Sequence, residues 1–250
     1  MIGDPMMERQ KMKWQIENYI LEVERAIREP IVERDIGTAE IDSDKAFFLL
    51  LPLLNGERWT SGLNTAAIAV GAVHAAFEAH DSISARSVST KEQQLTVLAG
   101  DHFSGIHYKL LASLPDFGLI RSVSRTIGHI NEMKTICHEQ MPDSVEELLL
   151  AFRLIEAGCI LDFLNLSGFS RYAPFASCAL PLLRLIAMEK EDGFFVDSRS
   201  GGTLDIESHR RLVALLTRQL QEVVEAADFL APFLRDEMQR IVAPLTGKLI

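Results

Sequence analysis

The sequence predicts an all-α protein, a single helical-bundle domain over residues 1–250 with about nine helices. Two observations lead to this prediction. Apolar residues recur at intervals of three and four along most of the chain, which is the period of an amphipathic helix, and no segment alternates convincingly between apolar and polar residues over strand length. Hydrophobic residues make up 48% of the chain and charged residues 24%, the usual balance of a globular protein, so a disordered or collagen-like chain is excluded.

Two helices are predicted near the N terminus. The first is indicated by apolar residues near helical spacing, Trp14, Tyr19, Ile20, Val23 and Ile27, and it is expected to end at Pro30. Asp42 or Ser43 can cap the second, because either side-chain oxygen can accept from the first backbone N–H groups of a helix. This helix is expected to run to Leu51, with Pro52 beyond it.

Three long helices are predicted next, at about 61–83, 91–114 and 117–140, the last two stopped by Pro115 and Pro142. The first is rich in alanine, and small side chains let neighbouring helices approach closely, so we expect it at the centre of the bundle. Residues 59–77 contain no charged side chain, and the length of this segment approaches the ~20 residues that a membrane-spanning helix needs. Its serine, threonine, asparagine, histidine and glycine residues favour a buried bundle helix instead.

The C-terminal half predicts four more helices. Asp143 and Glu146 have the spacing of a capping box for one that continues to about residue 166. Pro181 is expected to kink the next, at 172–188. Asp205 or Ser208 opens a helix that reaches about residue 230, and the last occupies the C terminus. Residues 191–203 contain three glycines and two serines and are predicted as a loop.

Charge and cysteine content exclude some functions. Twenty-five basic and 35 acidic residues give a formal charge of −10, which disfavours a general nucleic-acid binder. The three cysteines form no Cys-x-x-Cys pair, so neither a zinc knuckle nor a redox dithiol is indicated. Their odd number, and an N terminus without an apolar signal core, favour a cytoplasmic location with no integral membrane segment.

Two groups of polar residues stand out on the central helices. His74, Glu78 and Asp81 lie at i, i+4 and i+7, so they share a helix face that could bind a metal ion or form a polar stripe towards solvent or a partner. Asp101 follows Gly100 in an otherwise apolar segment. A buried or half-buried carboxylate is costly unless it is paired, so Asp101 either links two packed helices or faces a polar cavity.

Two segments carry a resemblance to a known family. The first reads His-Asp-Ser-Ile-Ser at residues 80–84, and the second reads Gln-Leu-Thr-Val-Leu-Ala-Gly-Asp at residues 94–101. Together they resemble the trans-prenyl diphosphate synthases, all-α enzymes with His-Asp-Asp-x-x-Asp on one helix and Leu-Ala-Gly-Asp-Tyr on the next. Within that group the chain is similar to component I of heptaprenyl diphosphate synthase, the small subunit. The resemblance is sharpest over residues 80–108 and weak towards the C terminus, and it implies the isoprenoid synthase fold.

The chain departs from the catalytic pattern at the first motif, whose positions here are His80, Asp81, Ser82 and Ala85. Ser82 and Ala85 stand where catalytic members have two further aspartates. Mg²⁺ prefers carboxylate and phosphate oxygens, and catalytic members hold it against the allylic diphosphate through two aspartate-rich motifs. No Asp-Asp pair occurs in this chain, so the second aspartate-rich motif is missing. The resemblance therefore implies no catalytic residue and no metal ligand here. Gly100 and Asp101 belong to the Leu-Ala-Gly-Asp motif of the family, which this chain keeps.

The resemblance implies a non-catalytic subunit that is inactive alone. Its partner would be component II, which brings the aspartates and the Mg²⁺, and together they would extend farnesyl diphosphate with isopentenyl diphosphate for the menaquinone side chain. The prenyl diphosphate chain would lie in a shared groove, where this subunit helps to set product length, and a loose membrane association is compatible with so apolar a product. Two alternatives stay open: a stand-alone metal-dependent enzyme using His74, Glu78 and Asp81, and a helical scaffold or adaptor without a prenyl-chain role.

Overall fold

The computed structural model describes residues 5–83, 90–115, 117–191, 194–196 and 203–246. These residues form eleven α-helices, one 3₁₀ turn and a small sheet. The helices are α1 (Pro5–Ile27), α2 (Pro30–Ile36), α3 (Ser43–Leu49), α4 (Leu51–Leu54), α5 (Ser61–Asp81), α6 (Lys91–Ala112), α7 (Phe117–Glu139), α8 (Val145–Leu166), α9 (Ala173–Ala187), α10 (Ile206–Glu225) and α11 (Pro232–Thr246). The 3₁₀ turn is η1 (Ser170–Tyr172), and the strands are β1 (Glu189–Glu191), β2 (Phe194–Val196) and β3 (Thr203–Asp205).

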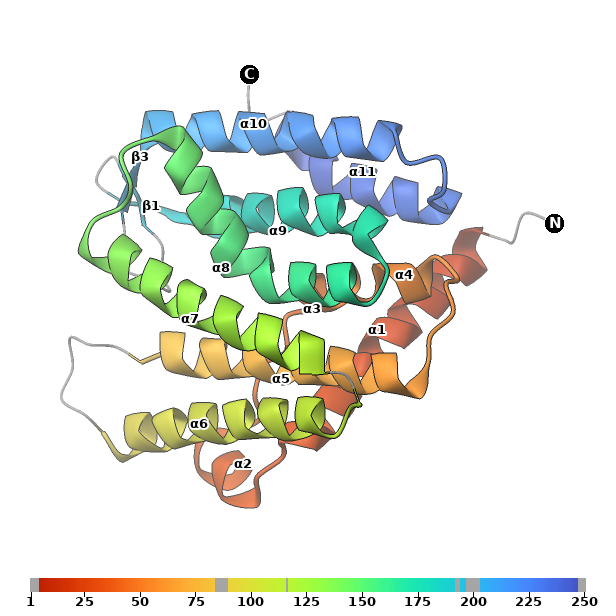
Figure 1. Ribbon diagram of the computed structural model, residues 1–250. Helices are drawn as coiled ribbons and strands as arrows, with labels where there is room; N and C mark the ends of the chain where they lie inside the picture. Colours follow the sequence, from red (N-terminus) through yellow and green to blue (C-terminus); the bar gives the residue numbers. More distant parts are fainter. Residues whose placement is uncertain (1–4, 84–89, 116, 192–193, 197–202, 247–250) are drawn as a thin grey trace.

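Helix α5 runs through the middle of the bundle, as its alanine content predicts (Figure 1). It packs most extensively against α6, and it also contacts α1 and α8. Helices α7, α8 and α9 pack in sequence, and α10 and α11 lie at the top of Figure 1, beyond α9. Helix α2 lies at the bottom against α6. The face of α5 from Ala66 to Ala76 is almost completely buried, so the centre of the bundle is packed with small side chains.

The structure confirms most helix ends and corrects several. Asp42, not Ser43, caps α3, because its carboxylate accepts from the backbone N–H groups of residues 44 and 45. Asp205 caps α10 in the same way. Ser144 rather than Asp143 caps α8. Pro30 does more than end α1: it begins α2, which is possible because the first helical position needs no N–H donor.

Other differences lie in the shorter elements. The second predicted helix divides into α3 and α4, α10 ends at Glu225 rather than near residue 230, and the predicted nine helices become eleven. The predicted loop at 191–203 contains strand residues, and β1, β2 and β3 pair antiparallel in that order. Phe195 of β2 stacks on the ring of His209 at 3.6 Å between ring centroids, which fastens this sheet to α10. The fold is nevertheless built from helices, as the sequence predicts.

One buried histidine, His107, and one partly buried histidine, His209, make the stability of the fold depend on pH. The Nδ1 of His107 lies 2.8 Å from the carbonyl oxygen of Ala69, and the Nε2 of His209 lies 2.8 Å from that of Leu185. Burial lowers the pKa of both side chains, although the hydrogen bonds to the carbonyl oxygens act in the opposite direction. An unfolded histidine titrates near pH ~6.5, so below that pH the unfolded chain binds protons that the folded chain does not.

We therefore expect the free energy of unfolding to fall as the pH drops below about 6.5 and to change little with these groups above it. Urea unfolding at pH 7.5 and pH 5.5 measures the difference. His107→Phe should reduce that difference, whereas the exposed His129→Gln should leave it unchanged. A chain that becomes more stable as the pH falls from 7.5 to 5.5 would contradict this account.

Candidate functional site

The two sequence motifs meet at the C-terminal end of α5. The ring of His80 lies directly over Gly100 of α6: a Cβ built at position 100 would stand 2.7 Å from two of its ring atoms. A larger residue at position 100 would displace the His80 ring from this position, so Gly100 allows the close contact between His80 and α6. The Nε2 of His80 also lies 3.7 Å from Oδ1 of Asp101. The contact joins α5 and α6, as expected for an aspartate that links two packed helices, but the Asp101 side chain is 67% exposed and not buried.

Asp81 is already paired with a cation of the chain itself. The Nζ of Lys134, on α7, donates a hydrogen bond to Oδ2 of Asp81 at 2.6 Å. The two side chains are only 16% and 20% exposed, and the ammonium also lies 4.6 Å above the centre of the Phe77 ring. A short, charge-assisted hydrogen bond away from bulk water is among the stronger polar contacts in a protein. The carboxylate left at the first motif therefore faces an ammonium group.

The neighbouring motif positions do not add a second carboxylate. Ser82 follows the last residue of α5, where its hydroxyl donates to the carbonyl oxygen of Ala79 at 2.8 Å. That hydrogen bond satisfies one of the carbonyl groups that a helix end leaves unpaired. Ala85 lies outside the described residues. Ser82 thus takes part in ending the helix.

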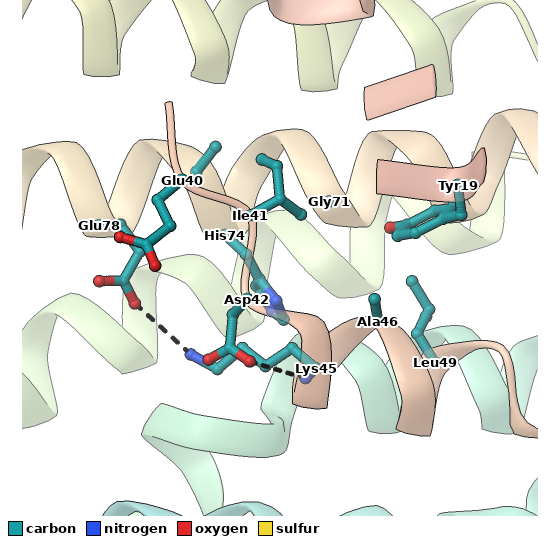
Figure 2. Close-up of a pocket in the computed structure, with 11 residues that line it drawn as sticks. Tyr19, Glu40, Ile41, Asp42, Lys45, Ala46, Leu49, Gly71, His74 and Glu78 are labelled. Atoms are coloured by element: carbon teal, nitrogen blue, oxygen red, sulfur yellow. Dashed lines mark hydrogen bonds and ion pairs between the residues drawn. The ribbon is translucent and has the colours of Figure 1, made fainter. Parts of the chain in front are cut away.

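A second set of charges lies inside the bundle, beside the first. Lys45 extends from α3 towards Glu78 of α5, and its Nζ lies 3.9 Å from Oε1 of Glu78 (Figure 2). The same Nζ lies 3.2 Å from Oε2 of Glu156. Arg184 of α9 approaches Glu156 from the other side, with Nε 3.8 Å from Oε1. Except for Glu78, these side chains are at most 11% exposed. The interior carboxylates are thus matched by cations from α3 and α9.

These contacts separate Asp81 from the other two residues of the proposed metal-binding face. Glu78 faces Lys45 and lines a small cavity together with His74, Glu40 and Asp42 (Figure 2). Asp81 does not line this cavity and pairs with Lys134 instead. The cavity has a volume of about 10 Å³, room for no more than a single water molecule. Within the described part of the chain, no three His, Cys, Asp or Glu side chains are arranged to hold a metal ion. His74, Glu78 and Asp81 share a helix face but not a common centre.

Cys159, which lies close to these charges, is not a candidate nucleophile. Cys159 of α8 is completely buried next to the internal charges. Burial raises the pKa of its thiol to about 12, and the negative charge of Asp162 acts in the same direction. The thiol is therefore protonated at neutral pH and cannot act as a nucleophile.

A larger groove runs along the outside of α5 and α6. It has a volume of about 570 Å³ and lies between these helices, α2 and residues 37–43. Its floor contains the small or apolar side chains of Ala75, Ala79, Ala99 and Phe103. Its rim carries four carboxylates, from Glu40, Asp42, Glu78 and Glu92. The groove has the size of a ligand site, with an apolar floor and an acidic rim.

Reasoning from the sequence did not identify Lys134, Lys45 and Glu156, whose charges pair with the acidic side chains or cations of this site. For Lys134 and Glu156, the helical pattern of buried positions could have identified them. Lys134 falls in the series of buried α7 positions formed by Val123, Ile130 and Cys137, and Glu156 falls in the corresponding series of α8. A charged residue on a core-facing helix position needs an internal partner.

The helices of the described residues include none that is long and apolar enough to span a membrane.

The chain matches one protein family over most of its length and one curated protein over half of it. A family model described as heptaprenyl diphosphate synthase subunit 1 matches residues 30–225. Heptaprenyl diphosphate synthase component 1 from Geobacillus stearothermophilus is 32% identical over 124 residues, which make up 50% of this chain and 56% of that protein. The match thus spans a little over half the length of this curated relative.

Solved structures of low sequence identity share the fold. An isoprenoid synthase family member from Thermotoga neapolitana superimposes with a TM-score of 0.59 at 15% identity, over 96% of this chain and 98% of that one. Heptaprenyl diphosphate synthase from Staphylococcus aureus gives 0.61 at 13% identity, over 95% and 90%. Geranylgeranyl pyrophosphate synthase from Lactobacillus brevis gives 0.63 at 13% identity, over 97% and 99%. These matches confirm the predicted isoprenoid synthase fold.

Proposed function

Because the chain belongs to the family of heptaprenyl diphosphate synthase subunit 1, we propose that it is the non-catalytic subunit of a two-component prenyl diphosphate synthase. In this proposal a second component brings the catalytic carboxylates and the Mg²⁺. The complex extends farnesyl diphosphate with isopentenyl diphosphate, and the product supplies the menaquinone side chain. This chain is required for activity but does not perform the chemistry.

The pairing of Asp81 with Lys134 carries the proposal. Ionisation of an allylic diphosphate leaves negative charge on the departing group, and divalent cations held by several carboxylates stabilise that charge. Here the carboxylate at the first motif hydrogen-bonds an ammonium at 2.6 Å, and the nearby Glu78 faces Lys45. A metal ion at Asp81 would have to displace Lys134 from a partly buried position. This arrangement supports a structural role for the motif and argues against the stand-alone metal enzyme.

We propose the outer face of α6 as the contact with the second component. Leu98 is 61% exposed, and Val97 and Tyr108 on the same face are each 38% exposed. Gly105 lies between them in sequence, and a Cβ built there would meet no atom within 4 Å, so a partner helix can approach closely. Large apolar side chains exposed along one helix face are typical of a protein interface.

The groove of about 570 Å³ is our candidate for the growing prenyl tail. Each buried CH₂ group of a tail contributes roughly 0.8 kcal/mol, so an apolar wall stabilises long products. Ala75, Ala79 and Ala99 leave room for such a tail. The acidic rim would repel a diphosphate, which fits a division of work in which the diphosphate stays with the second component.

Reconstitution tests the proposal. The purified chain with Mg²⁺, farnesyl diphosphate and isopentenyl diphosphate should form no elongated product, and adding the second component from the same organism should restore elongation. Product length is read by chromatography. Assembly without restored activity would favour a scaffold, and elongation by the chain alone would favour the stand-alone enzyme; either result would contradict the proposal.

Leu98→Glu tests the proposed interface. The substitution places a charge on an exposed residue, so the isolated chain should remain folded, but the charge would be buried without a partner in the complex. We expect affinity for the second component to fall at least tenfold, which corresponds to about 1.4 kcal/mol. Leu166→Glu, at a residue that is 52% exposed on α8, is the matched control and should not change the affinity. Equal affinities for both variants would rule out this face.

A further inference from the structure

A second groove lies at the corner between α7 and α8, apart from the α6 face. It is formed by the last turns of α7, the connection at residues 140–144 and the first turns of α8, and it has a volume of about 490 Å³. Neither the proposed site for the prenyl tail nor the proposed subunit contact uses it. Its lining combines large apolar side chains, which we call the floor, with three carboxylates, which we call the rim.

Two large apolar side chains of the floor are strongly exposed to solvent. Ile136 is 50% exposed and Leu150 is 64% exposed, and both line this one groove with Met133 and Met141. Single exposed apolar residues are ordinary on a protein surface, but several that share one hollow mark a binding surface. Methionine side chains are flexible and polarisable, so they adapt to the shape of an incoming side chain.

The rim is negative, and no described residue forms an ion pair with it. Glu139, Asp143 and Glu147 line the groove, and none of the three forms an ion pair with another described residue. No lysine or arginine in the described ranges lines it either. The carboxylates at the N-terminal end of α8 are favoured by the helix dipole, but Glu139 lies at the C-terminal end of α7, where the dipole disfavours a negative charge. Helix stability therefore does not account for Glu139.

We propose that this groove docks a basic amphipathic helix of a partner protein. Apolar side chains at positions i, i+3 or i+4, and i+7 of such a helix would insert between Ile136 and Leu150. Lysine and arginine residues flanking that stripe would lie against the carboxylates of the rim. An acidic rim excludes anionic lipid surfaces and nucleic acids, because both carry the same sign of charge.

Peptide binding tests this proposal on the full-length chain. The probe is a fluorescently labelled helical peptide with leucines on one face and lysines on the other, and its partner is the same peptide with glutamates in place of lysines. Fluorescence anisotropy should show saturable binding of the basic peptide and none of the acidic peptide. Ile136→Ser and Leu150→Ser should each weaken binding roughly tenfold, which is the loss of one well-buried apolar side chain.

Matched controls separate the groove from general attraction to an acidic chain. Leu166→Ser removes an equally exposed leucine elsewhere on α8 and should not change the affinity. Glu139→Gln should weaken binding severalfold at low salt, whereas the exposed Glu225→Gln should not. All five positions are on the surface, so these variants should fold as the parent chain does. The proposal fails if both peptides bind alike, or if Ile136→Ser and Leu166→Ser bind the peptide equally well.

Discussion

Replacing Glu156 with alanine is expected to lower the free energy of unfolding by about 3–5 kcal/mol. The Glu156 side chain is 6% exposed and lies between Lys45 at 3.2 Å and Arg184 at 3.8 Å. Its removal leaves two cations facing each other across a cavity in the bundle interior. Breaking a buried ion pair from one side costs far more than the pair itself contributes, because the remaining charge is held away from water.

Chemical unfolding of the parent and variant chains measures the loss. Glu222→Ala is the matched control, because Glu222 also lies near an arginine, Arg218 at 3.9 Å, but both side chains are more than two-thirds exposed. Exposed pairs contribute little, so this variant should lose no more than about 0.5 kcal/mol. Similar losses for the two variants would show that the interior charges do not form the network described above.

Gly71→Ala should have the second-largest effect, a loss of about 3 kcal/mol, at the upper end of what overpacking costs. Gly71 lies where α1 crosses α5, and a Cβ built there would stand 2.6 Å from both the hydroxyl oxygen of Tyr19 and a methyl group of Val23. Both side chains are buried, and the Tyr19 hydroxyl donates to the carbonyl oxygen of Ala67 at 2.8 Å. The added methyl group would force the two helices apart or break that hydrogen bond.

The same substitution elsewhere gives the control. Gly128 is in the interior of α7, and a Cβ built there would meet no atom within 4 Å. Gly128→Ala should therefore stabilise the chain by about 0.5–1 kcal/mol through helix propensity alone. Thermal unfolding of the two variants should give shifts of opposite sign. A stabilising or neutral Gly71→Ala would mean that α1 does not approach α5 as closely as described.

Local sequence signals predicted the helical framework because they act over a few residues. Proline positions and capping side chains such as Asp42 and Asp205 marked where helices begin or end, and hydrophobic periodicity marked which faces are buried. The short strands were missed because three-residue segments carry no periodic signal of their own. Phe195 is held there by packing on His209, a contact between separate elements.

The chemistry of the site was only partly predictable for a similar reason. The sequence itself shows Ser82 and Ala85, and the resemblance to catalytic members, which have aspartates at these positions, led to the hypothesis of a lost metal site. The partner of Asp81 cannot be read from the sequence. Lys134 lies 53 positions away, and only the folding of α7 towards α5 brings the two side chains together. Asp101 was expected to be buried or half-buried because its helix is apolar, yet its side chain is 67% exposed.

Asp81→Asn in the assembled synthase tests the central claim most directly. Asparagine keeps the shape of the side chain and an oxygen that can accept from Lys134, but it is a poor ligand for Mg²⁺. If Asp81 is structural, the complex of the variant with the second component should assemble and elongate farnesyl diphosphate at a rate within severalfold of the parent complex. A fall in rate by a factor of a hundred or more, with assembly intact, would mean that Asp81 holds a metal ion in a working site.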